Sequence, residues 1–470
     1  METDKSALVR GLNLVGATSI VVGTIIGTGI FLKARIMTCN VGTPGMVLLV
    51  WVVAGFSSLA GALTYAELAA MMPVAGGEYV FMREAYGRPW SFLYGWTQFS
   101  ISYACSQAAK GVVIAIMLNL LFGGKLEHNY FTYKVFNYPI RIGSMELIAI
   151  GSVWIVTAIN CLAVAVSGSV ISVLTVIKVA IVFFIALAAF LFAHGDWRHF
   201  SMSNIGGLCA GVSNSARGGV AGFGAAMLGA LWGYDGWSNL TIVAGEVKNP
   251  KRNIPIALIG GMLIVMLLYV CANLGYFYVL TPTEVANVSL QSSVATEVIQ
   301  KFLGPLAAAI MAAALLISSF GSLMTSILVA ARIPYAMARD RLIFPRFANV
   351  SQKSRVPVFA LLIQAIWISV LTLTGSFDAL TDSVIFASWI FYAMVTASVF
   401  IFRKKMPQAE RPYRTWGYPV VPLLFLLIAA GLFVDTIATA PVRSLLGLSL
   451  MLLGLPLYWY FNRSTAKTPR

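Results

Sequence analysis

Charged residues are scarce in this chain. Only 10% of its 470 residues are Asp, Glu, Lys or Arg, whereas 59% are hydrophobic, and the mean hydropathy is +0.84. A soluble globular protein carries roughly 25% charged residues, so the composition excludes that class. A bilayer core takes about 20 apolar residues as a helix, and the sequence offers successive runs of that length instead of the short alternating strands of a membrane barrel. We therefore expect an all-α membrane protein.

Cysteine and histidine are also rare. The five cysteines are scattered without CxxC spacing, so the sequence indicates neither a disulfide framework nor a metal site. Two of them, Cys39 and Cys209, are predicted in loops on the same side of the membrane. The three histidines all fall in predicted outer loops, which argues against haem ligation or a buried histidine relay. We expect no cofactor and no metal.

The net charge of +15 resides mainly in short loops between the apolar runs. These loops lack the interleaved aromatic residues of a basic nucleic-acid-binding domain, so no nucleic-acid partner is expected. Most of the 32 Lys and Arg residues lie in loops on the same side as the two termini. The positive-inside rule then predicts a multi-pass protein of the cell (inner) membrane with both termini in the cytoplasm. No cleavable signal segment is expected before the first apolar run.

Twelve membrane spans are predicted from these apolar runs. They cover residues 11–33, 44–70, 90–121, 145–167, 170–193, 219–244, 255–280, 304–336, 357–375, 383–402, 420–439 and 442–460.

Two of the spans, five apart in order, are rich in glycine at their centres. These segments run from Gly23 to Phe31 in the first span and from Gly229 to Trp237 in the sixth. Small residues such as Gly27 can simply let helices pack closely. Glycine-rich interruptions at matching places in two halves instead indicate an inverted-repeat transporter. The first repeat would cover 11–193, the second 219–402, and the two added helices 420–460.

A helix that breaks in the middle of the membrane exposes backbone groups. They are tolerated only where they line a cavity or contact a ligand. The new helix N-terminus offers N–H groups to a carboxylate, and the facing carbonyls suit an ammonium group. An α-amino acid carries both groups on one carbon, so the breaks predict a site for a small zwitterion. Neither a nucleophile with its base nor a selectivity-filter motif is present, so an enzyme or a channel is not expected.

Four motifs occur in order along the chain. They are Gly23-Thr24-Ile25-Ile26-Gly27-Thr28-Gly29-Ile30-Phe31; Tyr65-Ala66-Glu67-Leu68 followed by Gly76-Gly77-Glu78-Tyr79; Trp232 to Trp237 leading into Glu246-Val247-Lys248-Asn249-Pro250; and Arg411-Pro412-Tyr413-Arg414 before Gly417-Tyr418-Pro419. With these motifs the sequence resembles the amino acid-polyamine-organocation (APC) superfamily, and within it the L-type amino acid transporter (LAT)-like branch, in a prokaryotic form.

This resemblance implies two inverted five-helix repeats plus two extra helices, with the first and sixth helices broken. It also implies sodium-independent secondary transport by alternating access, which we expect to be exchange of neutral L-amino acids. The alternatives are an antiporter of cationic amino acids or polyamines and a proton-coupled amino acid symporter. Mammalian relatives join a heavy chain through an outer-loop cysteine, but the loop at 122–143 has no cysteine. No disulfide-linked heavy chain is therefore expected, and the oligomeric state is left open.

The resemblance further implies where the substrate binds. The implied substrate-binding residues are Ile25, Ile26, Gly27, Thr28, Gly29, Trp232, Gly233 and Asp235. The carboxylate would meet the backbone at Thr28 and Gly29, and the ammonium the carbonyls of Ile25, Trp232 and Asp235. The Trp232 side chain would also close over the substrate as a gate.

Lys178 lies near the middle of the fifth predicted span. A cation at that depth costs at least about 2.5 to 3.5 kcal/mol. With about eight residues at 1.5 Å to the nearer end, the stem is too short to reach the headgroups comfortably. The resemblance implies that this lysine replaces the sodium ion of sodium-coupled relatives. It would hold the first span against the eighth, near Ser318, Ser319 and Ser322.

Three other charges are candidate pocket or gate residues. Asp235 either caps freed N–H groups or biases the pocket toward cationic or long polar substrates. Lys110 in the third span either pairs with Asp235 or faces the vestibule. Glu67, at the end of the second span, either forms an interfacial ion pair with Arg83 and Arg88 or latches an inner gate.

Overall fold

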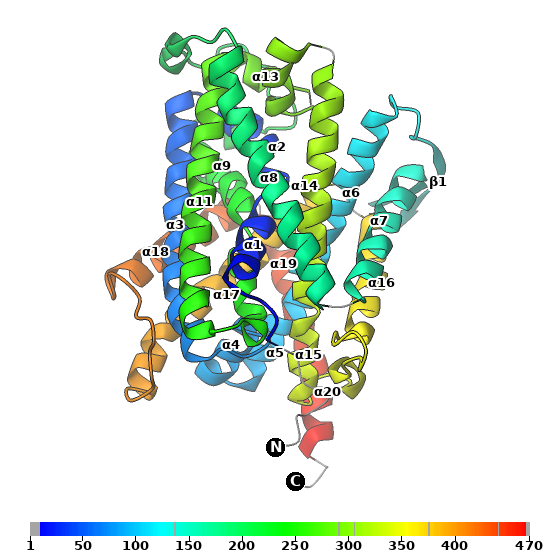
Figure 1. The fold of residues 1–470 in the computed structure, drawn as a ribbon, viewed down its shortest axis with the longest axis vertical. Coiled ribbons are helices and arrows are strands. Elements are labelled where there is room, and N and C mark those ends of the chain that lie inside the picture. The colour runs from blue at the N-terminus through cyan, green and yellow to red at the C-terminus, as the bar shows by residue number, and fades with distance from the viewer. Residues whose placement is uncertain are drawn as a thin grey trace.

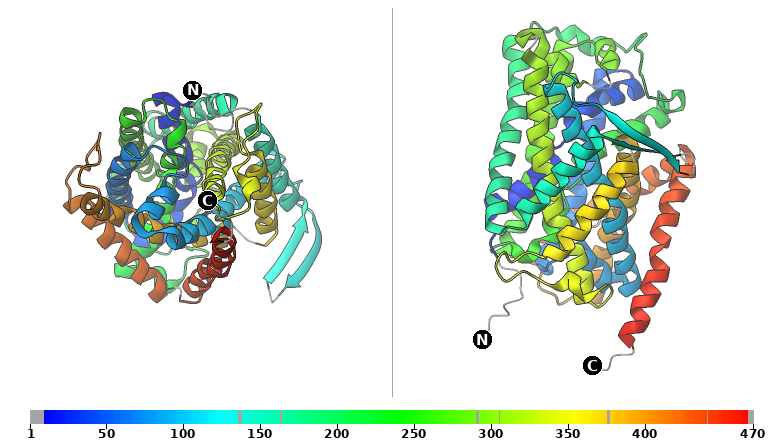
Figure 2. Two further views of the ribbon diagram at one scale, coloured as in Figure 1. Left: turned by 90° about the horizontal axis from the view of Figure 1, so that it is seen from below. Right: turned by 90° about the vertical axis from the view of Figure 1, so that its right-hand side faces the viewer.

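A computed structural model describes residues 10–135, 138–162, 164–289, 292–304, 306–374, 377–439 and 441–466. The long helices run side by side along the vertical axis of Figure 1 and form one bundle. The first and last described residues lie at the same end of it (Figure 2). Residue 375, predicted to end the ninth span, and the two chain termini lie outside the described residues.

The helices have the following bounds. In chain order they are α1 (Leu14–Ile25), α2 (Gly29–Val41), α3 (Pro44–Met71), α4 (Glu78–Tyr86), α5 (Arg88–Thr97), a π-helical turn (Gln98–Ser102), α6 (Tyr103–Leu121), α7 (Ser144–Asn160), α8 (Val164–Phe192), α9 (Gly219–Tyr234), α10 (Asn239–Ile242), α11 (Pro250–Val279), α12 (Pro282–Asn287), α13 (Val294–Leu303), α14 (Leu306–Ala330), α15 (Arg332–Arg339), α16 (Val358–Thr374), α17 (Phe377–Lys405), α18 (Val420–Thr439), α19 (Pro441–Leu452) and α20 (Gly454–Ala466). Short 3₁₀ turns occupy Trp197–Ser201, Asn214–Ala216, Ala244–Glu246 and Pro345–Ala348.

Apolar helices long enough to cross a bilayer dominate the described chain. Seven helical segments meet that requirement, and three shorter apolar helices accompany them. Together these ten segments coincide with ten of the twelve predicted spans. A multi-pass helical membrane protein is thereby confirmed, whereas the count of twelve and the inverted symmetry remain predictions.

Both glycine-rich segments interrupt their helices. The first span is split into α1 and α2, with residues 26–28 between them. The sixth is split into α9 and α10, and Gly236 in the gap adopts a φ of +102°, which is a left-handed backbone that glycine adopts without a steric penalty. The broken helices lie inside the bundle, because α1 packs against α8, α11 and α14, and α9 packs against α2 and α3. The fold therefore places the two gaps at its centre.

An antiparallel hairpin departs from the all-α expectation. β1 (Asn129–Val135) pairs with β2 (Tyr138–Gly143), with Thr132 opposite Arg141. The hairpin lies in the loop between the third and fourth predicted spans and projects from the side of the bundle (Figure 2). Its strands are rich in aromatic and β-branched residues, which favour a pleated surface. A search of the loops for such runs would have predicted it.

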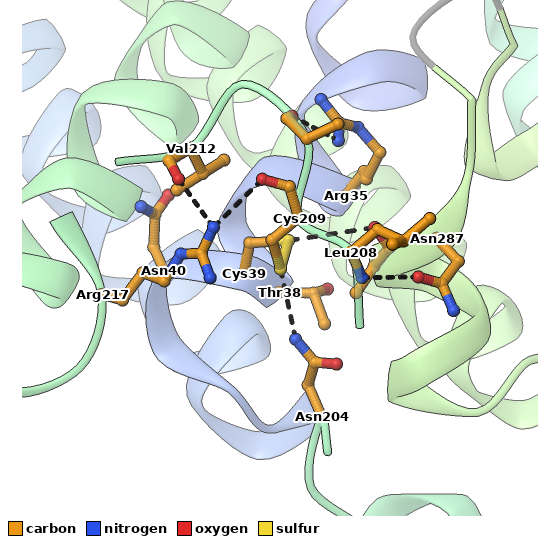
Figure 3. The surroundings of a disulfide bond; sticks show 12 residues. Arg35, Thr38, Cys39, Asn40, Asn204, Leu208, Cys209, Val212, Arg217 and Asn287 are labelled. Carbon is orange, nitrogen blue, oxygen red and sulfur yellow. Dashed lines mark hydrogen bonds between the residues drawn. A yellow bond between two sulfur atoms is a disulfide. The ribbon is translucent and has the colours of Figure 1, made fainter. Parts of the chain in front are cut away.

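A disulfide joins Cys39 to Cys209 across 170 residues, so the expectation of no disulfide framework was wrong. Cys39 lies on α2 rather than in a loop, and Cys209 lies in the segment before α9 (Figure 3). Arg217 donates to the Cys209 carbonyl oxygen at 3.2 Å, and Asn204 donates to its sulfur at 3.4 Å. Spacing could not reveal this pair, because only the three-dimensional fold brings the two cysteines together.

Candidate binding site at the helix breaks

The two helix breaks touch each other through glycine. A Cβ atom added to Gly29 would lie 2.5 Å from the Cα atom of Gly233, which is far inside normal van der Waals contact. A Cβ on Gly233 would in turn lie 2.7 Å from the Trp51 ring. Only glycine at both positions lets α2 and α9 approach this closely, so the packing of the breaks depends directly on these two residues.

Lys178 connects the first break to two other helices. Its side chain is buried on α8, and its ammonium donates to the Gly23 carbonyl oxygen at 2.7 Å and to the Ser322 hydroxyl at 3.4 Å. Gly23 belongs to the last turn of α1, whose carbonyls lose their usual partners where the helix ends. The lysine thus satisfies one freed carbonyl and ties α8 to α1 and α14, the helices of the first and eighth predicted spans.

Ser318 on α14 satisfies the carbonyls within the gap itself. Its hydroxyl lies 3.3 Å from the Ile26 carbonyl oxygen and 3.2 Å from that of Gly27. The neighbouring Ser319 hydroxyl is buried and has no hydrogen-bond partner among the described residues. Ser318 therefore forms hydrogen bonds with the first break, whereas Ser319 makes none.

Tyr269 on α11 is a site residue that the sequence did not indicate. Its hydroxyl lies 3.1 Å from the carbonyl oxygen of Ile25 and 3.0 Å from that of Gly233. Because the first carbonyl ends α1 and the second lies near the end of α9, one hydroxyl holds both breaks together. A tyrosine within an apolar span carries no sequence signal for this role, since only the fold shows which carbonyls it meets.

A small polar cavity lies beside the breaks. Its lining includes Thr24 of α1, Lys110 of α6, Asp235 after α9, Ser326 of α14 and Tyr392 of α17. Its volume is about 20 Å³, which gives room for roughly one water molecule. An amino acid does not fit, so the structure shows a closed arrangement of these helices.

A larger cavity of about 250 Å³ lies between α9, α17 and α18. Its lining includes Leu228, Trp389 and Phe433 but no charged residue. A zwitterion would lose its hydration there without gaining a charged partner. The small polar cavity is therefore the better candidate site, although it is the smaller of the two.

Lys110 and Asp235 face each other across the polar cavity. Each charge acts on the other, but they do not form one of the ion pairs of the described residues. The Tyr392 hydroxyl donates to the Asp235 carboxylate at 3.0 Å. Lys110 thus faces the cavity and lies near Asp235 without forming a direct ion pair.

Glu67 has partners other than those predicted. It pairs with Arg403 at 2.8 Å and with Arg411 at 3.4 Å, and it accepts from the Thr415 backbone N–H at 2.7 Å. The predicted partner Arg83 instead binds Asp340 at 2.6 Å. The prediction of an ion pair with the nearby loop was wrong because α17 and the segment after it, distant in sequence, pack against the end of α3.

Comparison with known proteins identifies the class. The sequence model of the amino acid permease family matches residues 12–455. The chain therefore belongs to this family, which confirms the predicted APC membership. It is a membrane transporter of amino acids rather than an enzyme.

Relatives along the whole chain place it in the LAT-like branch. It is 31% identical to the serine/threonine exchanger SteT of Bacillus subtilis, over 99% of this chain and 100% of that protein. It is 29% identical to the human b(0,+)-type amino acid transporter 1, over 98% of this chain and 89% of that protein. It is also 29% identical to the human large neutral amino acids transporter small subunit 2, over 96% of this chain and 80% of that protein.

Proposed function

We propose that this protein exchanges neutral L-amino acids across the cell membrane by alternating access and without sodium. The observation that carries the proposal is the buried Lys178 ammonium on the Gly23 carbonyl. A freed carbonyl at a helix break is a ligand suited to a bound cation, and the lysine supplies that charge permanently. Transport then needs no external cation to hold α1 against α14. The exchange mode is supported by the serine/threonine exchanger among the relatives.

The substrate's charged ends would bind the two breaks. Gly29 begins α2. The Phe31 and Leu32 N–H groups donate to the Thr28 carbonyl oxygen, so the N–H of Gly29 at the start of the helix is the one that would bind a carboxylate. The ammonium would approach the carbonyls at the end of α9 and of α1, in the region of Ile25, Trp232 and Asp235. Binding would require the Tyr269 hydroxyl to share or yield its contacts with these carbonyls. Trp232, which is buried on α9, would close over the bound molecule.

Selectivity for neutral side chains follows from the charges of the cavity. One cation, Lys110, and one anion, Asp235, line the same space, and together they contribute no net charge. A cationic side chain would gain from Asp235 but be repelled by Lys110, and an anionic one would meet the reverse situation. A small neutral polar side chain avoids both penalties. Antiport of cationic amino acids or polyamines is the second candidate, and it is favoured by Asp235 alone.

The proposed orientation has the termini in the cytoplasm. Basic residues concentrate in the loops on the side of the termini, as the positive-inside rule requires. Disulfides persist in oxidising compartments. Cys39 lies in the last turn of α2, and α2 lies toward the end of the bundle opposite the chain ends (Figure 1). The loop at 122–143 has no cysteine for a heavy chain, so the transporter would work without one.

Counterflow in proteoliposomes tests this function. The purified chain is reconstituted into vesicles loaded with unlabelled serine, and uptake of radiolabelled serine is measured with sodium or choline outside. We expect saturable uptake that internal serine stimulates and that is equal in the two salts. Competition by alanine, leucine, arginine and agmatine then separates the neutral from the cationic alternative. Strict dependence on sodium, or preference for arginine and agmatine, would reject the proposal.

A further inference from the structure

Glu78 is a buried acid without a cationic partner among the described residues. It is the first residue of α4, its exposed fraction is 1%, and neither carboxylate oxygen makes a hydrogen bond among the described residues. It lies outside the helical segments that are long enough to span a membrane. Buried carboxylates are normally ion-paired or hydrogen-bonded, so this side chain requires a physical explanation.

The surroundings of Glu78 offer hydroxyl groups and one like charge but no cation. The titratable groups around it are Tyr65, Tyr94, Tyr103, Tyr392 and Asp235. The Tyr65 and Tyr94 hydroxyls are themselves buried without a partner, and the Ser238 hydroxyl is close by. The Ser238 and Tyr94 hydroxyls favour the ionised carboxyl group, but burial outweighs them, and no cation among the described residues pairs with it.

The basic side chains on neighbouring elements are engaged elsewhere. Arg83 binds Asp340, Arg332 binds Glu246, Arg403 binds Glu67, Arg88 binds the Asp340 carbonyl, and Lys405 binds the Ala85 carbonyl. Arg339 and Lys404 are exposed to solvent. The helix dipole of α4 favours an anion at its first residue, but that effect is small beside the cost of burying an uncompensated charge. Burial accordingly raises the pKa of Glu78 to about 7.

The position of Glu78 connects it to the sixth-helix break. The Gly76 N–H donates to the Ile242 carbonyl at 2.8 Å, and a Cβ on Gly77 would overlap the Thr241 carbonyl. The start of α4 therefore packs tightly against α10, beside the turn that carries Asp235 and Ser238. Any movement that separates α10 from α4 would admit water to the carboxyl group.

We propose that Glu78 is a proton-binding site of the closed transporter. The carboxyl group holds a proton while α4 is packed against α10, and it transfers that proton to water when the contact opens. The neutral acid needs no counter-ion in the buried cluster, and the released anion is stabilised by hydration. Proton binding thus favours closure. Protonation in the closed state stands independently of the transport activity, whereas its coupling to turnover rests on the proposed function.

Infrared spectroscopy tests the protonation directly. In Glu78→Gln an amide replaces the neutral acid with almost the same shape. We expect the purified wild-type protein to show a carboxylic acid C=O band at neutral pH that Glu78→Gln lacks and that disappears as the pH rises. Glu84→Gln is the matched control, because Glu84 lies on the same helix, is partly exposed and pairs with Arg83 at 2.8 Å. Its spectrum should keep the band.

Exchange measured at equal pH on both sides of the vesicle, from about pH 5 to about pH 9, tests the coupling. We expect wild-type and Glu84→Gln exchange to fall above neutral pH, approaching about ten-fold per pH unit, and Glu78→Gln exchange to stay flat. An identical band or an identical pH profile in wild type and Glu78→Gln would overturn the proposal. So would failure of Glu78→Gln to fold, because a neutral acid tolerates an amide in its place. If wild type exchanges no amino acid at all, the proposed function fails, and the infrared result still decides on Glu78.

Discussion

Removal of the Lys178 ammonium should stop transport more than it alters stability. In Lys178→Met the stem remains, but the bonds to the Gly23 carbonyl at 2.7 Å and to Ser322 at 3.4 Å are lost. A buried carbonyl left unsatisfied costs about 1 to 3 kcal/mol. The substitution also removes the cost of placing a cation in the membrane interior, which is about 2.5 to 3.5 kcal/mol. The two terms nearly cancel, so the melting temperature should change by only a few degrees.

The transport rate should nevertheless fall, although the stability is nearly unchanged. A charge-assisted hydrogen bond is worth about 1.5 to 3 kcal/mol, and this one is made where α1, α8 and α14 must meet in the closed state. Its loss should lower the exchange rate roughly ten- to hundred-fold. The assay is proteoliposome exchange with choline in place of sodium, with Lys404→Met as an exposed control that should behave as wild type. Full activity of Lys178→Met without sodium would refute the reasoning.

Three further substitutions test the site. Gly29→Ala places a methyl group 2.5 Å from the Gly233 backbone and should abolish the thermal stabilisation that substrate produces. In the control Gly45→Ala, where nothing lies within 4 Å of the added methyl group, substrate should stabilise the protein as in wild type. Normal binding by Gly29→Ala would contradict the geometry. Tyr269→Phe removes the single O–H donor that the Ile25 and Gly233 carbonyls share and should lower the free energy of unfolding by about 1 to 3 kcal/mol. Tyr276→Phe, whose hydroxyl has no partner among the described residues, should leave the melting temperature unchanged, and equal effects of the two substitutions would refute the bridging role. Asp235→Asn should lower arginine transport relative to leucine in competition assays because it removes an opposite charge from a buried pocket, and an unchanged ratio would favour a structural role.

The helix breaks were predictable because they depend on local sequence. Glycine at matching places of two apolar segments marks where a helix cannot continue, and the structure ends α1 at Ile25 and α9 at Tyr234. Lys178 was found for a similar reason, since a cation inside an apolar run is costly wherever the run packs. Both signals depend only on residues within about one span. Neither needs knowledge of which helices are neighbours.

The groups that complete the site depend on contacts across the fold, and no local pattern reports them. Tyr269 holds both breaks because α11 packs beside α1, and Glu67 selects Arg403 rather than Arg83 because α17 packs against α3 and α4. Glu78 belongs to a motif that is visible in the sequence, yet its importance lies in what is missing around it. A missing partner can be recognised only when every neighbour is known, so an unpaired buried acid is a property of the folded protein rather than of the sequence motif.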